Sequence, residues 1–255
     1  MNLNLQNKTA IIVGGAQGIG RAIADAFIAE EAQVAIIDRE AEVTGFPGEV
    51  RQADVADFEA TKKAADDLAS QFGQIDHVIF SVGIGSGKTG FPFWNVAPQD
   101  WMQVLQVNLI GAVHTAQAFA PYMQQGDSHG RSLLFITSVA GQVGSQTDPP
   151  YSASKAGLIN FMQCVARDLA ADGIRSNALA PGMVKTSLNR SVWKASQVTK
   201  SYQDWADEKI KRIAPLGQWQ DPEEYGAMAV YLASPQAKNI TGQTINIDGG
   251  QVMHS

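Results

Sequence analysis

The sequence predicts a doubly wound, Rossmann-like α/β fold with about seven parallel strands and helices on both faces of the sheet. Short, fully apolar runs, such as residues 9–13 and 33–38, alternate along the chain with longer segments of helical periodicity. Strands that are apolar on both faces indicate a sheet covered on both sides. A glycine-rich segment directly after the first apolar run is typical of the first strand-to-helix turn of such folds.

Each element can be placed by its pattern. Strands are expected at residues 9–13, 33–38, 50–55, 76–83, 132–138, 174–182 and 242–250. Helices are expected at residues 20–31, 58–72, 99–123, 151–170 and 221–234, the last opened by Asp221 as N-cap with Pro222 behind it. Roughly residues 183–220 are expected to form a long irregular excursion over the substrate region. No linker is evident, so residues 1–255 are expected to form a single domain.

Composition restricts the class of protein. The 255 residues are 45% hydrophobic, which suffices for one sizeable core. The net charge of -6, without a basic cluster, disfavours a nucleic-acid partner. No signal peptide and no membrane-spanning run is evident, so a cytoplasmic protein without a membrane partner is expected. Cys164 is expected to pack on a buried helix face, and the histidine spacing predicts no metal site.

The segment AIIVGGAQGIGRAIA places Gly14, Gly18 and Gly20 between the first strand and its helix. Glycines there permit a tight turn and let a pyrophosphate approach the helix N-terminus; the alternative is an ordinary turn. The second strand ends in Asp38, whose carboxylate could accept hydrogen bonds from an adenosine ribose and repel a 2′-phosphate. Asp38 favours NAD over NADP as cofactor, although the neighbouring Arg39 could bind a phosphate.

A second group of residues indicates proton transfer. Tyr151 and Lys155 are four residues apart in a predicted helix and therefore lie on one helix face. A cation beside a phenol favours the phenolate, so the pair could move a proton near neutral pH. Polar or glycine residues also end most of the predicted strands, at the sheet edge where such folds bind ligands: Gly14, Asp38, Asp54, Gly83, Ser138, and Pro181 with Gly182.

Over essentially its whole length, the chain resembles the short-chain dehydrogenase/reductase family. The motifs that carry the resemblance are GGAQGIG, ADV at 53–55, NLIGA, SVAG, YSASK, IRSNALAPGMVKT and ITGQTINIDGG. The resemblance implies that Tyr151 exchanges a proton with the substrate, Lys155 lowers the pKa of Tyr151, and Ser138 polarises the substrate oxygen. It also implies that Asn108 holds a water in a proton relay, and that the protein is a homo-tetramer.

The resemblance implies a nicotinamide dinucleotide cofactor in a site with a defined set of residues. In that site Asp54 and Val55 would flank the adenine, and Thr186 would fix the nicotinamide carboxamide. The complete set is Gly14, Gln17, Gly18, Ile19, Gly20, Asp38, Asp54, Val55, Gly83, Tyr151, Lys155, Pro181, Gly182, Val184 and Thr186.

Two positions depart from the family pattern. Val13 replaces the usual threonine before the first glycine, and Phe80-Ser81-Val82 replaces the usual Asn-Asn-Ala. Losing a hydroxyl and an amide together indicates an apolar repacking between the first and fourth strands, because one polar partner left alone would cost about 1–3 kcal/mol. We interpret the departure as structural, with a non-catalytic dinucleotide sensor as the alternative.

The segments SASK at residues 152–155 and KTG at residues 88–90 also match the S-x-x-K and K-T-G motifs of the penicillin-binding serine enzymes. In those enzymes the order is reversed and an S-D-N motif stands between the two, which this chain lacks. Acyl-enzyme chemistry is therefore disfavoured.

The substrate is expected to be a polar secondary alcohol or its ketone, of sugar or polyol size and neutral or anionic. Polar residues in the segments after strands four to six support this expectation, with four singled out as substrate contacts: Lys88, Trp94, Gln142 and Arg190. A hydrophobic cyclic or steroid-like alcohol is the alternative, in a pocket lined by Phe91, Phe93, Val143, Val184 and Leu188. A 3-oxoacyl-type reductase is a further alternative.

Overall fold

The computed structural model of the chain, described over residues 2–88, 92–144, 148–195 and 198–253, contains a seven-stranded parallel sheet. Its strands are β1 (Thr9–Val13), β2 (Gln33–Asp38), β3 (Glu49–Gln52), β4 (His77–Phe80), β5 (Ser132–Ile136), β6 (Arg175–Pro181) and β7 (Thr244–Ile247). The strand order is β3-β2-β1-β4-β5-β6-β7, so the chain changes direction across the sheet between β1 and β4. The predicted doubly wound fold is confirmed.

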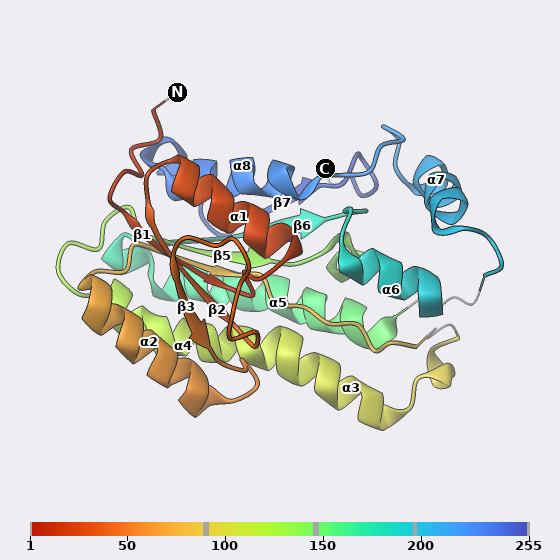
Figure 1. Cartoon of the computed structure of the whole chain (residues 1–255), viewed down its shortest axis with the longest axis horizontal. Helices are drawn as coiled ribbons and strands as arrows, with labels where there is room; N and C mark the ends of the chain where they lie inside the picture. Colours follow the sequence, from red (N-terminus) through yellow and green to blue (C-terminus); the bar gives the residue numbers. More distant parts are fainter. Residues whose placement is uncertain (1, 89–91, 145–147, 196–197, 254–255) are drawn as a thin grey trace.

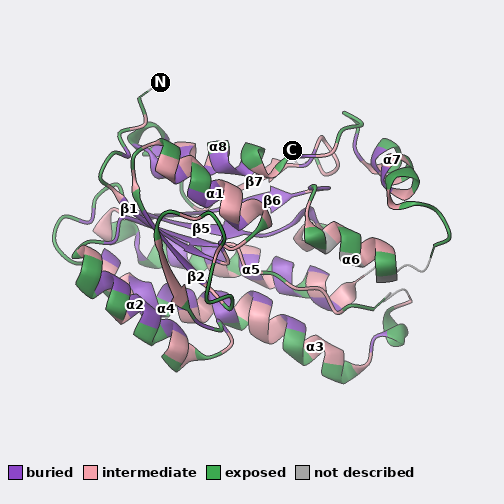
Figure 2. Ribbon diagram, in the orientation of Figure 1, coloured by how far each residue is buried: buried purple, intermediate pink, exposed green. Residues whose placement is uncertain are grey.

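Helices cover both faces of the sheet (Figure 1). The helices on one face are α1 (Gly18–Ala29) and α8 (Pro222–Ala233), and those on the other are α2 (Phe58–Phe72), α4 (Gly111–Met123) and α5 (Pro149–Asp168). Side chains alternate along β1, so Ala10 and Ile12 pack in the core under α1 and α8, whereas Ile11 and Val13 pack in the core on the other face. Figure 2 shows the central strands buried between the two helical layers, whereas the edge strands β3 and β7 are only partly buried.

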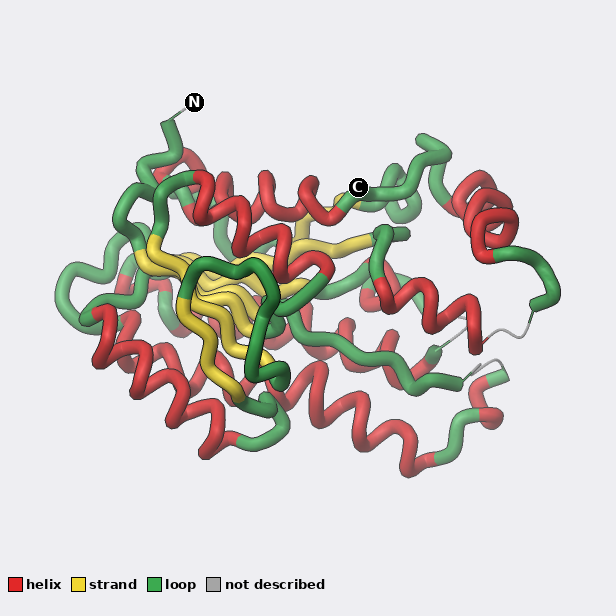
Figure 3. Tube along the Cα trace, in the orientation of Figure 1, coloured by secondary structure: helices red, strands yellow, loops and turns green. Residues whose placement is uncertain are grey.

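The excursion after β6 is more ordered than the sequence predicted. It contains α6 (Ser187–Ala195) and α7 (Tyr202–Ile213), which stand away from the sheet in Figures 1 and 3. Ser201 caps α7 by accepting a 3.1 Å hydrogen bond from the Asp204 N–H. A small core of Met183, Ile210 and Ala214, flanked by Trp205 and Trp219, supports the helix. The prediction of an irregular segment was wrong because few apolar positions suffice for this small core.

The helix predicted over 99–123 is divided into three parts. A first helix, α3 (Pro98–Leu105), leads into a π-helical turn (Gln106–Ile110), and α4 follows. The described residues also contain four short 3₁₀ helices, at Phe93–Asn95, Val139–Gly141, Ala170–Asp172 and Pro235–Ala237. None of the helices within the described ranges is long and apolar enough to cross a membrane.

Two further predictions about helices have definite outcomes. Asp221 does open α8, and its N–H donates a 2.8 Å hydrogen bond to Glu224 Oε1. Cys164, by contrast, is exposed on α5, so its predicted burial was wrong. The apolar residues around Cys164 in the sequence do not determine its orientation, because neighbouring positions on a helix point in different directions.

Candidate active site

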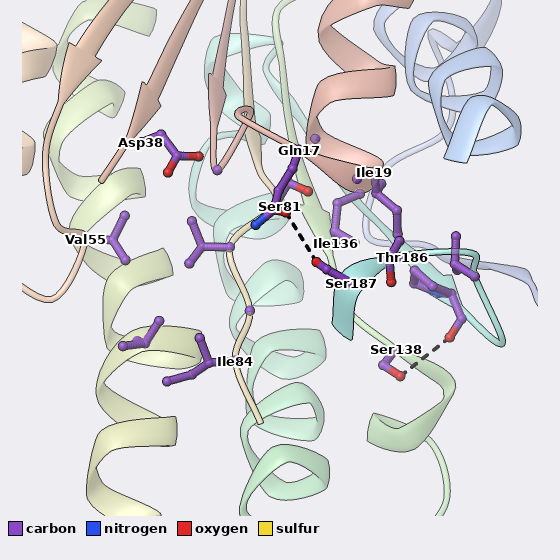
Figure 4. A pocket seen from close by; sticks show the side chains of 18 of the residues that line it. Gln17, Ile19, Asp38, Val55, Ser81, Ile84, Ile136, Ser138, Thr186 and Ser187 are labelled. Atoms are coloured by element: carbon purple, nitrogen blue, oxygen red, sulfur yellow. Dashed lines mark hydrogen bonds between the residues drawn. The ribbon is translucent and has the colours of Figure 1, made fainter. Parts of the chain in front are cut away.

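A cavity of about 270 Å³ opens at the carboxyl ends of the strands and runs from Asp38 to Tyr151. It is lined from both halves of the sheet, at the point where the chain changes direction between β1 and β4. All fifteen residues that the resemblance assigns to the cofactor line this cavity. Figure 4 shows Asp38 and Val55 at one side of the cavity, and Ser138 and Thr186 at the other.

The glycine turn forms one wall of the cavity. Gly14 has φ +85° and Gly18 has φ +59°, conformations that other residues adopt only with strain. A Cβ atom on Gly14 would lie 2.7 Å from Val82 Cγ2, so the backbone can pass this point only as glycine. Opposite the turn, the Ser187 hydroxyl at the start of α6 donates a 3.3 Å hydrogen bond to Gln17 Oε1 (Figure 4). The turn and α6 therefore enclose the cavity between them.

Asp38 ends β2 at the far side of the cavity and is partly exposed. One carboxylate oxygen accepts a 3.0 Å hydrogen bond from the Ala16 N–H, and the other accepts one of 3.3 Å from the Glu40 N–H. Arg39 also lines the cavity. Arg21, the nearest cation on α1, donates instead to the carbonyls of Thr44 and Gly45 and does not line the cavity.

The predicted catalytic residues Ser138, Tyr151 and Lys155 meet at the other end of the cavity. Ser138 lies just after β5, and its hydroxyl is hydrogen bonded to Tyr151. Lys155 is buried on α5, with Nζ 5.7 Å from the centre of the Tyr151 ring and 2.8 Å from the Ile136 carbonyl oxygen, to which it donates. The helical spacing thus brings the amine and the phenol together as predicted.

Burial controls the ionisation of both groups. Burial, together with the charge of Asp148 and against the hydrogen bond from Ser138, raises the pKa of Tyr151 to about 12. Burial also lowers the pKa of Lys155 to about 7. The expectation that Lys155 brings the pKa of Tyr151 below its ordinary value is therefore not met in the protein alone, because burial outweighs any such effect.

Asn108 lies in the π-helical turn and does not line the cavity. Its amide is fully buried and clamps the backbone of Ile84: Oδ1 accepts from the Ile84 N–H at 2.8 Å, and Nδ2 donates to the Ile84 carbonyl at 2.9 Å. Nδ2 also donates to Ser154 Oγ at 3.0 Å. The amide thus fixes the segment after β4 against α5, and the water relay implied by the resemblance stays a prediction.

The four residues predicted to contact the substrate all lie outside the cavity lining. Lys88 forms a 2.6 Å ion pair with Asp100, and Trp94 is 71% exposed with its ring against Phe93. The Gln142 side chain exchanges two hydrogen bonds with the Asn246 amide, and the Arg190 guanidinium stacks 5.0 Å above the Tyr202 ring. Lys88, Gln142 and Arg190 thus have partners 12 or more positions away, which the spacing of residues in the sequence does not show.

Of the residues predicted to line a pocket for a hydrophobic substrate, only part is found at the cavity. Val184 lines the cavity, whereas Phe93 and Val143 are exposed outside it. Phe91 lies outside the described residues, and nothing is described of the Leu188 side chain.

Sequence reasoning missed several residues that line the cavity. Most are apolar or small and sit at strand ends or just beyond them: Ile37, Ala53, Ser81, Val82, Ile84, Ile136 and Thr137. Val107 comes from the π-helical turn. Ser187 and Asn189 come from α6, and Asn189 Nδ2 donates 2.7 Å to the Val184 carbonyl. The signal for the first group was present, because residues beside a strand-end glycine or serine share its edge of the sheet.

The junction that departs from the family pattern is apolar, as expected. Val13 pairs with Phe80 in register between β1 and β4, and both are buried in one hydrophobic cluster against which Val82 packs. The hydroxyl and the amide that the family usually has at this junction are both replaced, so neither is buried without its partner.

Ser152, the serine of the SASK match, has no nucleophile geometry. Its hydroxyl donates to the carbonyls of Ala140 and Val143, away from Lys155, whose amine donates to Ile136. The structure therefore gives no support to acyl-enzyme chemistry.

The residues fit a dinucleotide. A glycine turn at the start of α1 offers backbone N–H groups for a pyrophosphate, and a carboxylate stands where a ribose would lie. When bound, the nicotinamide of such a cofactor supplies or accepts a hydride. The protein's own part is then to hold the substrate oxygen between Ser138 and Tyr151, and to move one proton at the phenol oxygen. Fold and site together define a dinucleotide-dependent oxidoreductase.

Comparison with known proteins identifies the family. The family model described as enoyl-(acyl carrier protein) reductase matches residues 14–252. The 3-oxoacyl-[acyl-carrier-protein] reductase FabG of Thermotoga maritima is 32% identical, over 98% of this chain and 100% of its own length. The D-threitol dehydrogenase of Mycolicibacterium smegmatis is 31% identical, over 98% and 94% of the two chains. The chain belongs to the short-chain dehydrogenase/reductase family of oxidoreductases.

Solved structures show the same fold. Aldohexose dehydrogenase of Thermoplasma acidophilum superimposes with a TM-score of 0.91 at 24% identity, covering 100% of this chain and 98% of its own. The L-sorbose reductase of Gluconobacter frateurii, solved with NADPH and L-sorbose, gives 0.90 at 24% identity with full coverage of both chains.

Proposed function

We propose that the protein is an NAD-dependent dehydrogenase/reductase that interconverts a polar secondary alcohol of sugar or polyol size and its ketone. The observation that carries the proposal is the cavity itself, which has a hydroxyl, a phenol and an amine at one end and the Asp38 carboxylate at the other. Ser138 and Tyr151 would hold the substrate oxygen, and Tyr151 would take the proton from the alcohol or return it to the ketone. The intact Ser138–Tyr151 hydrogen bond favours this role over a non-catalytic sensor.

The preference for NAD rests on charge at the ribose end. Asp38 is held by the Ala16 and Glu40 N–H groups, so its carboxylate is fixed beside the place where a 2′-phosphate would lie. A fixed anion repels a phosphate and accepts hydrogen bonds from a free 2′-hydroxyl. Arg39 works in the opposite direction, but its side chain is exposed, and solvent screens exposed charges.

A neutral substrate is favoured over an anionic one. The two cations predicted to contact the substrate, Lys88 and Arg190, are engaged by Asp100 and Tyr202 and do not line the cavity. The half-buried Asp148 carboxylate, three residues before Tyr151, would also repel an anion. The similarity to a D-threitol dehydrogenase supports a polyol.

A 3-oxoacyl thioester is the second candidate substrate, because relatives named as 3-oxoacyl-[acyl-carrier-protein] reductases are equally similar to this chain. A site built for hydroxyl groups rejects analogues that lack them, because its buried polar groups would be left unpaired. The two substrates should therefore be separated by a large ratio of kcat/KM.

The test is a panel of substrates, in which turnover of each substrate is measured by the absorbance of the nicotinamide cofactor. Neutral polyols and sugars, acidic sugars, cyclic alcohols and hydroxysteroids are assayed with NAD and with NADP, and a 3-oxoacyl thioester with both reduced cofactors. Highest kcat/KM on a neutral polyol or sugar with NAD is expected. Highest kcat/KM on the thioester or on a steroid would contradict the proposed substrate, and a preference for NADP would contradict the proposed cofactor.

A further inference from the structure

Asp148 is a half-buried acidic residue that joins two segments beside the reacting phenol. It is the N-cap of α5, three residues before Tyr151, and its Oδ1 accepts a 3.4 Å hydrogen bond from the Tyr151 N–H. Its Oδ2 accepts a 2.8 Å hydrogen bond from the Ser86 N–H, in the segment after β4. The Ser86 side chain is hydrogen bonded to the same carboxylate.

The segment after β4 is shaped to receive this carboxylate. A Cβ atom on Gly85 would lie 2.7 Å from Asp148 Oδ2, so only glycine lets the carboxylate approach. One residue earlier, the Asn108 amide holds both backbone polar groups of Ile84. Ile84 lines the cavity, so the Asp148 and Asn108 side chains together fix the wall that faces Tyr151. Neither the Asn108 contact nor the Asp148 contact belongs to a local turn, because each joins residues more than 20 positions apart.

The charge of Asp148 also acts on Tyr151. Within the described residues, three groups act on the phenol: the Ser138 hydroxyl by a hydrogen bond, the Lys155 amine beside the ring, and the Asp148 carboxylate at the start of α5 by its charge. An anion close to a phenol disfavours the phenolate, and burial strengthens the effect because little water screens it. Lys88, the cation nearest in sequence to Ser86, pairs with Asp100 on α3.

We propose that Asp148 is a positioning residue of the proposed reaction, which locks the segment at residues 84–86 against α5 and opposes ionisation of Tyr151 by its charge. The inference rests on the proposed function for its second part, whereas the first part concerns the structure alone. A carboxylate in this place keeps the phenol protonated up to a higher pH, because it makes the phenol a weaker acid and its phenolate a stronger base. In alcohol oxidation, where the phenolate is the base, Asp148 therefore moves the working range to higher pH.

Two variants separate the charge from the hydrogen bonds. Asp148→Asn keeps an oxygen acceptor for the Ser86 N–H and loses the charge, whereas Asp148→Ala loses both. The matched control is Asp57→Asn together with Asp57→Ala: Asp57 caps α2 through a 3.1 Å hydrogen bond from the Ala60 N–H and does not line the cavity.

The first measurement is the pH profile of kcat/KM for alcohol oxidation. Asp148→Asn is expected to shift the acidic limb to lower pH by roughly half a unit or more, since removal of an anion lowers the pKa of the phenol. The Asp57 variants should leave the limb where it is. An unshifted limb in Asp148→Asn would overturn the electrostatic part of the proposal.

The second measurement is hydrogen exchange of the peptide that contains Ser86, followed by mass spectrometry without cofactor or substrate. Asp148→Ala should speed exchange there by roughly tenfold, the change that about 1.4 kcal/mol of lost protection produces. Asp148→Asn should exchange nearly as the wild type does. Unchanged exchange in Asp148→Ala would overturn the anchoring role, and inactivity of the wild type on every alcohol would contradict the proposed function alone.

Discussion

The Lys155 amine lies 5.7 Å from the centre of the Tyr151 ring and donates a 2.8 Å hydrogen bond to the Ile136 carbonyl. Lys155 is 2% exposed, and burial lowers the pKa of its amine to about 7. No carboxylate pairs with it among the described residues. The protein thus keeps an amine in the site whose protonation changes near neutral pH.

Replacing Lys155 by methionine should stabilise the protein without cofactor, most of all at and below pH 7. Above that pH the folded wild type has released a proton that the unfolded chain still binds, up to about pH 10.4. Wild-type stability therefore rises with pH relative to Lys155→Met, and the advantage of the variant should shrink by up to about 1.4 kcal/mol per pH unit. Urea unfolding at pH 7, 8 and 9 measures the difference.

Lys62→Met is the control for this experiment, because Lys62 is half exposed and paired with Asp66 on the surface of α2. The difference in unfolding free energy between Lys62→Met and the wild type should stay constant over the same pH range. A flat difference for Lys155→Met as well would show that the amine remains protonated in the folded protein. Turnover of Lys155→Met should be severely reduced, since the amine also lines the cofactor cavity.

Removing the charge of Asp38 should weaken the preference for NAD. Asp38→Asn keeps an acceptor for the Ala16 N–H, so the glycine turn stays in place while repulsion of a 2′-phosphate disappears. The ratio of kcat/KM with NAD to kcat/KM with NADP is expected to fall by roughly tenfold or more. Arg39→Ala should move the ratio the other way, and Asp67→Ala, exposed on α2, should not move it. An unchanged ratio in Asp38→Asn would show that the charge of Asp38 does not determine the choice of cofactor.

A side chain on Gly14 should damage both the fold and the cofactor site. Gly14→Ala would combine φ +85° with a Cβ atom 2.7 Å from Val82 Cγ2. Gly73→Ala is a matched control, because Gly73 has φ +74° but nothing within 4 Å of the added atom. Gly73→Ala should cost about 1 kcal/mol of unfolding free energy. Gly14→Ala should cost more and also weaken NAD binding, as urea unfolding and a fluorescence titration would show; equal costs would mean that the turn moves aside freely.

The cofactor half of the site could be predicted from the sequence because its chemistry is local. Gly14, Asp38 and Ser138 each lie at or within two residues of the end of an apolar strand, and the parallel sheet brings these strand ends to one edge. The spacing of Tyr151 and Lys155 likewise needs only helical geometry.

The substrate half could not be predicted in the same way, because the orientation of its polar side chains depends on partners distant in the sequence. The Gln142 side chain is hydrogen bonded to Asn246, 104 residues away. The Arg190 guanidinium stacks on the ring of Tyr202, on a helix that the sequence did not indicate. For Asp148 a signal existed: an aspartate before two prolines is an N-cap pattern. Its contact with Ser86, 62 residues away, required the structure.

The most direct test of proton transfer by Tyr151 is turnover of Tyr151→Phe on the best substrate of the panel. The variant keeps the ring and loses only the phenol oxygen, so NAD affinity should change little while kcat falls by about 10²–10⁴. Tyr122→Phe is the control, because that phenol bonds Asp66 Oδ1 at 2.7 Å outside the cavity, and its kcat should match the wild type. If Tyr151→Phe kept more than roughly a tenth of the wild-type kcat, Tyr151 would not be the group that exchanges the proton.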